Sequence, residues 1–381
     1  MAGTAKAKVG GATARAPRKS AAVARAKARR TAKVADTPLI SICLPTYKRT
    51  KFLHGCIASC LAQTAHNFEL IIHDDTQDDS IKSIVESFGS DKIRYIQNKP
   101  GLGLIRKLND FMDQVRSDWM VYLCDDDLLE PGYIAATTRH IADYPAAALI
   151  RCRHRLIDIN GDDLRLDGKS PLRSTNYEFL AQLFRPDLQS FRTNVSAVAF
   201  NKATLRRVGG IRETGRSWHT DRLAWAEMGA LGDTICDPEP LARLRLHGES
   251  LSSGLDAEYQ GAIDATLALK PYLANVYAKM RDDAKTPDQL VLVAESENGF
   301  EGYIERSLRR AVDQGLLAAI AEPGRNARAD VRAAETVLRA HGIRPFRSFH
   351  IYRMASYLPP VLRASFMKRF QRRKLDKLAV S

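Results

Sequence analysis

The sequence of 381 residues lacks several features that would assign a protein class at once. No stretch approaches the roughly 18 consecutive apolar residues that identify a membrane-spanning helix. The basic N-terminus has no apolar segment of the kind found in secretory signals. The six cysteines include no C-x-x-C pair, so neither a disulfide framework nor a zinc site is expected. These absences favour a cytoplasmic protein that is not embedded in a membrane.

Two phosphate-binding loops are also absent from the sequence. No G-x-G-x-x-G follows the first expected strand, and G-x-x-x-x-G-K-[ST] occurs nowhere. Dinucleotide redox enzymes and P-loop enzymes use these loops to hold phosphate groups. Both classes are therefore disfavoured.

Acidic residues are nearly missing from the two ends of the chain. Residues 1–35 carry five Lys, five Arg and no acid, and residues 361–381 carry seven basic residues against Asp376. The remaining residues, 36–360, have 41 basic and 43 acidic side chains. Because this part is nearly neutral, the net charge of +14 does not predict a folded domain that binds specific nucleic acid.

The N-terminal segment 1–36 is a low-complexity run of Ala, Lys and Arg. With few large apolar side chains it cannot offset its chain entropy, so we expect a disordered tail. Such a tail could attract anionic membranes or nucleic acid. It also resembles an organellar transit peptide, and a solvated tail without a specific role is equally consistent with the composition.

From residue 38 onward, apolar strands alternate with amphipathic helices. Strands are predicted at 39–45, 68–75, 92–98 and 119–124, and helices at 51–63, 79–88 and 102–115. This alternation indicates an α/β fold, a mostly parallel sheet with helices on both faces. Ligands bind such sheets outside the carboxyl ends of the strands.

Polar residues follow three of the four predicted strands at that edge. They are Thr46-Tyr47, Asp74-Asp75 and Asp125-Asp126-Asp127. Neighbouring carboxylates stay ionised most easily when they share a divalent cation, and Mg²⁺ or Mn²⁺ binds oxygen ligands together with substrate phosphates. The Asp run could instead be a solvated turn or a helix N-cap. The second Asp pair favours a metal–nucleotide site and hence sugar-nucleotide chemistry.

The motifs between residues 38 and 255 resemble, in order, those of family 2 glycosyltransferases, inverting enzymes with the GT-A fold. The likeness begins with PLISICLPTYKRT and FELIIHDDTQDDS, where Lys48 and Gln77 replace the family's usual Asn and Ser. NKPGLGLIRKLND is similar to its Gly-rich segment. YLCDDDLLEPGYI is similar to its Leu-Asp-x-Asp-Asp-x-x-x-Pro block, with Cys124 at the first Asp.

The second half of the resemblance covers the acceptor side. VSAVAFNKATLRRVGGIRE precedes SWHTDRLAWAEMG, in which Thr220 stands where Glu is common and Asp221 is kept. PLARLRLHGESLS is similar to the closing Tyr-Arg-x-His stretch, with Leu244 in place of Tyr. Together these motifs are specific to the family, although no single one is.

The resemblance implies a role for each candidate residue. The nucleotide pocket is expected to be lined by Pro45, Thr46, Tyr47, Asp74, Asp75, Arg106 and Asp125. Asp126 would hold Mg²⁺ or Mn²⁺, with Asp127 and His247 as further ligands. Asp221 would be the general base that takes the proton from the acceptor hydroxyl. A structural His, a surface Arg106 and a helix-capping Asp221 are the alternatives.

Residues 257–381 lie beyond the resemblance and have helical periodicity, for example at 258–280, 299–321 and 332–342. We expect an all-α region that packs on the domain of residues 37–256 or serves oligomerisation. It ends in VLRASFMKRFQRRKL, a basic amphipathic helix that could lie peripherally on the anionic inner face of the cytoplasmic membrane. The alternative is a helix packed on the domain.

The predicted function is transfer of a sugar from a nucleotide-sugar donor, a UDP-sugar first, to a glycan or lipid-linked glycan acceptor. Envelope polysaccharide synthesis is the expected setting. A sugar nucleotidyltransferase is the main alternative, although PTYKRT lacks the Gly-rich loop such enzymes usually carry. A nucleic-acid-associated basic protein is the other.

Overall fold

The computed structural model describes residue 3 and residues 39–185, 194–215, 217–247, 260–322, 324–360, 362–367 and 369. The chain divides into two units, Met1–Pro38 and Leu39–Ser381. The predicted tail 1–36 therefore falls almost wholly outside the described residues, and everything below concerns the second unit.

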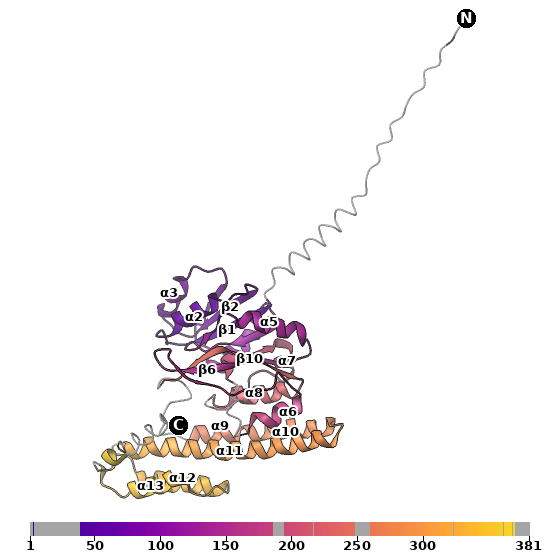
Figure 1. Cartoon of the computed structure of the whole chain (residues 1–381). Coiled ribbons are helices and arrows are strands. Elements are labelled where there is room, and N and C mark those ends of the chain that lie inside the picture. Colours follow the sequence, from indigo (N-terminus) through magenta and orange to yellow (C-terminus); the bar gives the residue numbers. More distant parts are fainter. Residues whose placement is uncertain are drawn as a thin grey trace. The chain divides into compact units, whose positions relative to one another are not determined.

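The first half of this unit follows the predicted alternation (Figure 1). Its strands are β1 (Ile40–Thr46), β2 (Phe68–Asp74), β3 (Ile93–Gln97) and β4 (Trp119–Tyr122). Its helices are α2 (Leu53–Leu61), α3 (Ser80–Glu86) and α4 (Leu104–Gln114). All pairings among these four strands, in the order β3-β2-β1-β4, are parallel.

The second half of the sheet is mixed in direction. Its strands are β5 (Leu128–Leu129), β6 (Leu149–Ile157), β7 (Asp163–Leu166), β8 (Arg173–Ser174), β9 (Val198–Asn201) and β10 (Thr234–Arg245). β9 runs antiparallel to both β4 and β6, whereas β10 is parallel to β6. The α/β class is confirmed; the first half of the sheet is wholly parallel, and the second half combines the parallel β6–β10 pair with antiparallel pairs.

The remaining helices of this domain lie between these strands in the sequence. They are α5 (Tyr133–Asp143), α6 (Asn176–Leu183), the 3-10 turn η2 (Val195–Ala197), α7 (Lys202–Arg207) and α8 (Thr220–Gly229). From residue 260 the described chain is helical: α9 (Gln260–Leu267), α10 (Leu269–Asp283), α11 (Pro287–Ala321), α12 (Ala327–Ala340) and α13 (Arg347–Ala355).

Buried apolar side chains cover both faces of the sheet. In β1, Ile40, Ile42 and Leu44 belong to one core cluster and Cys43 to the other, because successive side chains of a strand point to opposite faces. The cluster that contains Cys43 continues without interruption through α6 and α8 into α11, α12 and α13. The helical region is therefore packed on the α/β domain through one shared core.

The 35-residue helix α11 is the axis of that helical region. It contacts α6, α9, α10, α12 and α13; Figure 1 shows α11 itself in orange and α12 and α13 in yellow. Thr286 caps its N-terminus: its hydroxyl oxygen accepts a hydrogen bond from the Gln289 backbone N–H, and Gln289 Oε1 accepts one from the Thr286 backbone N–H. Pro287 follows at the first helical position, which proline favours.

The predicted basic helix at 361–375 is described only at residues 362–367 and 369. There Leu362 is 59% exposed and Phe366 is 38% exposed, whereas Met367 belongs to the core. Part of the expected apolar face thus packs inward. In the described part of the chain no helix combines the length and apolar character needed to cross a bilayer.

Candidate active site

One pocket of about 490 Å³ opens at the carboxyl ends of the parallel strands. Pro45 of β1 and the turn after β4 contribute one wall, and the first turn of α8 contributes another. The charged residues that line it are Arg49, Asp126, Asp127, Asp221, Arg222, Arg245 and Arg310. The sequence-predicted Asp126, Asp127 and Asp221 thus lie around a single cavity.

Asp125 turns away from the pocket lining and is held by protein partners. Its carboxylate accepts a hydrogen bond of 2.9 Å from Thr46 Oγ1 and forms an ion pair with the Arg49 guanidinium. Arg49 also donates to Asp126 Oδ2 at 3.1 Å. Arg49 therefore neutralises part of the charge of two neighbouring carboxylates, and it was not among the predicted site residues.

Asp126 and Asp127 contact the end of β10. His247 Nε2 lies 2.9 Å from Asp126 Oδ2, so the structure brings these two predicted residues together. Asp127 accepts hydrogen bonds from Ser196 Oγ at 2.6 Å and from the Arg245 backbone N–H at 2.9 Å. The turn after β4 is thereby fixed against η2 and the last strand of the sheet.

These contacts offset only part of the cost of burying the adjacent carboxylates of Asp125, Asp126 and Asp127. Burial raises the pKa of Asp125 to about 6, even though Arg49 opposes the shift. Burial and the neighbouring Asp126 raise the pKa of Asp127 to about 7. Such shifts report charges that are incompletely compensated, and a bound divalent cation would compensate them.

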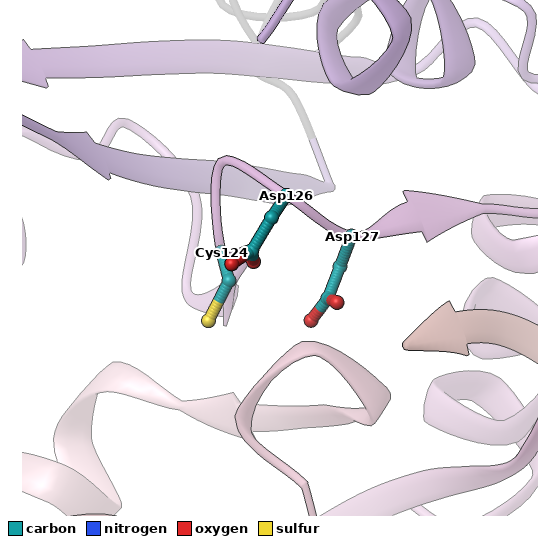
Figure 2. A group of neighbouring side chains, drawn as sticks. All are labelled: Cys124, Asp126 and Asp127. Atoms are coloured by element: carbon teal, nitrogen blue, oxygen red, sulfur yellow. The ribbon is translucent and has the colours of Figure 1, made fainter. Parts of the chain in front are cut away.

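Cys124, Asp126 and Asp127 have donor atoms within 4.8 Å of one another. Figure 2 shows the sulfur and the two carboxylates directed to the same side of the turn. Burial raises the pKa of the Cys124 thiol well above its usual range. Two carboxylates fit Mg²⁺ or Mn²⁺, and the Cys124 sulfur in the third position is a softer donor. The residues present therefore fit a divalent cation.

Asp74 and Asp75 follow β2 as predicted, but their oxygens already have partners within the protein. Asp74 accepts hydrogen bonds from the Thr76 backbone N–H and from Tyr95 Oη, each at 2.7 Å. Asp75 accepts from Asn98 Nδ2 and from the backbone N–H groups of Leu102 and Gly103. Asp75 therefore fixes the loop that leads into α4.

Lys107, rather than the predicted Arg106, is the basic residue of α4 that points into the protein next to Asp75. Arg106 is exposed and does not line the pocket. Lys107 is buried, lies 3.1 Å from Asp75 Oδ2 and donates to the carbonyl of Thr46 at 2.7 Å. Tyr47 is likewise 51% exposed and outside the pocket lining.

Asp221 lies in the first turn of α8, where it is half-buried at the pocket wall. One carboxylate oxygen accepts a hydrogen bond of 2.7 Å from the Arg222 backbone N–H. Burial raises its pKa, and the charge of Arg222 opposes the shift. Trp218, just before this helix, and Trp225, within it, also line the pocket.

Residues 41–208 match the model of glycosyl transferase family 2. An uncharacterized glycosyltransferase of Rickettsia typhi is 35% identical over 212 residues, which cover 55% of this chain and 65% of the relative. An uncharacterized protein of Mycobacterium tuberculosis is 29% identical over 128 residues, 34% of this chain and 39% of the relative. The matches thus span about two thirds or less of these two curated relatives.

Among solved structures, Staphylococcus aureus TarS 1-349 has a TM-score of 0.53 at 12% identity, with 83% of this chain and 90% of that chain covered. Its complex with UDP-GlcNAc gives 0.52 at 15% identity, with 83% and 91% covered. The fold is that of the GT-A glycosyltransferases, followed by a helical region. The predicted resemblance to family 2 glycosyltransferases is thus confirmed over residues 41–208.

Proposed function

We propose that this chain transfers a sugar from a nucleotide-diphosphate sugar to a hydroxyl group of a glycan or lipid-linked glycan, with inversion at the anomeric carbon. The observation that carries the proposal is the single pocket lined by Pro45, by Asp126 and Asp127, and by Asp221. A donor diphosphate beside Asp126 and Asp127 and an acceptor hydroxyl beside Asp221 would lie in the same cavity. UDP-sugars are the first donors to test.

Asp126 and Asp127 are the proposed protein ligands of Mg²⁺ or Mn²⁺, with Cys124 and His247 close enough to contribute. A bound divalent cation supplies Lewis-acid stabilisation of the leaving nucleoside diphosphate. Asp125 contacts Thr46 and Arg49, and these contacts hold the turn after β4, which carries the proposed ligands, in place. Asp74 and Asp75 would contribute by ordering the nucleotide side of the pocket.

Asp221 is the proposed general base. The oxygen of the acceptor hydroxyl forms a bond to the anomeric carbon of the donor, and the bond from that carbon to the diphosphate oxygen breaks. The hydroxyl proton passes to the Asp221 carboxylate, and the electron pair of the broken bond leaves with the nucleoside diphosphate. A raised pKa suits this role because it makes the carboxylate a stronger base.

The setting and the partners are proposals of the same kind. The acceptor is a polysaccharide of the cell envelope, and the enzyme works in the cytoplasm at the membrane surface. The exposed Leu362 and Phe366, together with the basic ends of the chain, would make a peripheral contact with anionic lipid. Oligomerisation through the helical region remains a further proposal.

The experiment is a transfer assay with radiolabelled sugar nucleotides and a bacterial membrane extract as acceptor. We expect labelled product with one donor and release of nucleoside diphosphate, both abolished by EDTA and restored by Mn²⁺ or Mg²⁺. A parallel reaction with nucleoside triphosphate and sugar 1-phosphate tests the nucleotidyltransferase alternative. Pyrophosphate release in that reaction, with no sugar transfer in the first, would reject the proposal.

A further inference from the structure

The helical region supplies part of the pocket wall. Tyr303, Ser307 and Arg310 of α11 line the same cavity as Asp126 and Asp221, although they lie more than 70 residues beyond the end of α8 in the sequence. Tyr303 Oη lies 2.6 Å from His219 Nδ1, and His219 immediately precedes α8. This contact joins the helical region to the segment that carries Asp221.

Cations gather at this wall. The guanidinium of Arg222 lies 4.8 Å from the centre of the Tyr303 ring and donates to the carbonyl of Leu183. Arg306, one turn before Arg310 on α11, donates to the carbonyl of Phe184. Arg310 is exposed and makes no hydrogen bond or ion pair with the described part of the chain.

These arginines repel one another. Burial lowers the pKa of Arg306, and the charge of Arg222 lowers it further. Burial lowers the pKa of His219 to about 4, with Arg222 and Arg310 adding to the shift, so this histidine is neutral near pH 7. The nearby acid Glu305 is paired with Arg309. On this side of the pocket, Asp221 is the lining carboxylate that faces the cations, since Asp126 and Asp127 line the opposite side with Arg49 and Arg245.

We propose that the wall formed by Arg222, Tyr303, Ser307 and Arg310 is an acceptor subsite that binds an anionic group, a phosphate or a carboxylate, carried by the acceptor glycan. Cations placed close together repel one another, which costs free energy, and a bound anion offsets this repulsion. The hydroxyl group of Ser307 supplies a neutral hydrogen-bond donor beside them, whereas the Tyr303 hydroxyl is held by His219 Nδ1. The inference rests on the proposed glycosyl transfer and narrows its acceptor to anionic glycans.

The subsite also explains how a helix outside the family-matched segment could set acceptor specificity. The donor side of the pocket is built from residues 45–127, within that segment. The residues on α11 lie far beyond it in the sequence. A change of acceptor could therefore arise through α11 without disturbing the carboxylates after β4.

The test measures binding of inorganic phosphate, D-glucuronate and neutral D-glucose to the full chain in EDTA, by the fluorescence of Trp218 and Trp225. We expect a saturable change with phosphate or glucuronate and none with glucose; the stronger of the two anions identifies the group. Arg310→Gln should weaken anion binding about tenfold or more, because a charge-assisted hydrogen bond is lost. Arg309→Gln is the matched control, because Arg309 is paired with Glu305.

No anion binding by the wild type, or equal weakening by Arg310→Gln and Arg309→Gln, would overturn the inference. Binding of UDP-GlcNAc with Mn²⁺ is measured on the same variants by calorimetry. Donor binding should be unchanged by Arg310→Gln, since Arg310 lies on the acceptor side. If no sugar nucleotide binds the wild type while Arg310-dependent anion binding persists, glycosyl transfer fails and the anion site stands.

Discussion

At the scale of single residues, Asp221 combines position and chemistry. It lines the pocket from the first turn of a helix and is half-buried, so it can be both a base and a favourable charge at a helix N-terminus. Measurements of stability and of turnover distinguish the two roles. Loss of a helix-terminal charge affects stability, whereas loss of a general base affects turnover.

We therefore expect Asp221→Asn to lower kcat by about 10²- to 10⁴-fold while donor affinity is retained. Because the base must be ionised, wild-type kcat should fall as the pH is lowered through the raised pKa of Asp221, and the variant should lack this limb. Asp282→Asn, at an exposed position on α10, is the control. Wild-type turnover by Asp221→Asn would leave Asp221 as a helix-capping residue.

The inward position of Lys107 could have been predicted from the sequence, although Arg106 was chosen instead. In the predicted helix, positions 104, 107, 108 and 111 fall on one face, and Leu108 and Phe111 on that face are buried. Lys107 therefore had to point inward and Arg106 outward. The helical period was a sufficient signal. The roles of Arg49 and Ser196 depend on contacts between distant segments, which no local pattern reports.

At the scale of elements, the strand–helix alternation was enough to predict the first half of the fold. β1, β2 and β4 match the expected segments because strands buried on both faces read as continuous apolar runs, and the half-buried β3 matches through its apolar residues Ile93, Tyr95 and Ile96. The second half was less accessible. β9 and β6 pair antiparallel across the middle of the sheet, and β10 contains a register shift near Pro240. Such pairings are set by tertiary packing.

The packing of α8, the helix that carries Asp221, can be tested at Gly229. A Cβ at this position would lie 2.4 Å from two ring carbons of Phe179, whose side chain is fully buried on α6. We expect Gly229→Ala to destabilise the protein by about 1–3 kcal/mol, the usual cost of overpacking a core. Chemical denaturation measures this change.

Gly55→Ala is the matched control for that experiment. Gly55 lies in α2, and the nearest atom to an added Cβ, Leu128 Cδ2, is 3.9 Å away. Since alanine is favoured over glycine inside helices, this variant should be stabilised by about 0.5–1 kcal/mol. Equal stability of the two variants would mean that Phe179 does not pack against α8 as described.

At the scale of the whole molecule, one core cluster joins the sheet to the C-terminal helices. It contains Cys43 and Met120 from the sheet, Leu308 and Val312 from α11, and Tyr352 from α13. The sequence predicted a helical region after residue 257 but left open whether it packs on the domain. The composition of a helix does not reveal which surface its apolar side contacts, so the contribution of α11 to the pocket emerged only from the fold.

Because the core is shared, the α/β domain and the helices α9 to α13 are expected to unfold in one transition, and a ligand bound at the pocket should stabilise both. The most direct test of the account is therefore the unfolding temperature with a panel of sugar nucleotides, in Mn²⁺ and in EDTA. At a concentration 100 times its Kd, a specific donor stabilises the protein by about 2.7 kcal/mol. We predict this protection for one donor with Mn²⁺, and its loss both in EDTA and in Asp126→Asn. Protection that survives in both, or no protection by any sugar nucleotide, would contradict a metal-dependent donor site at Asp126.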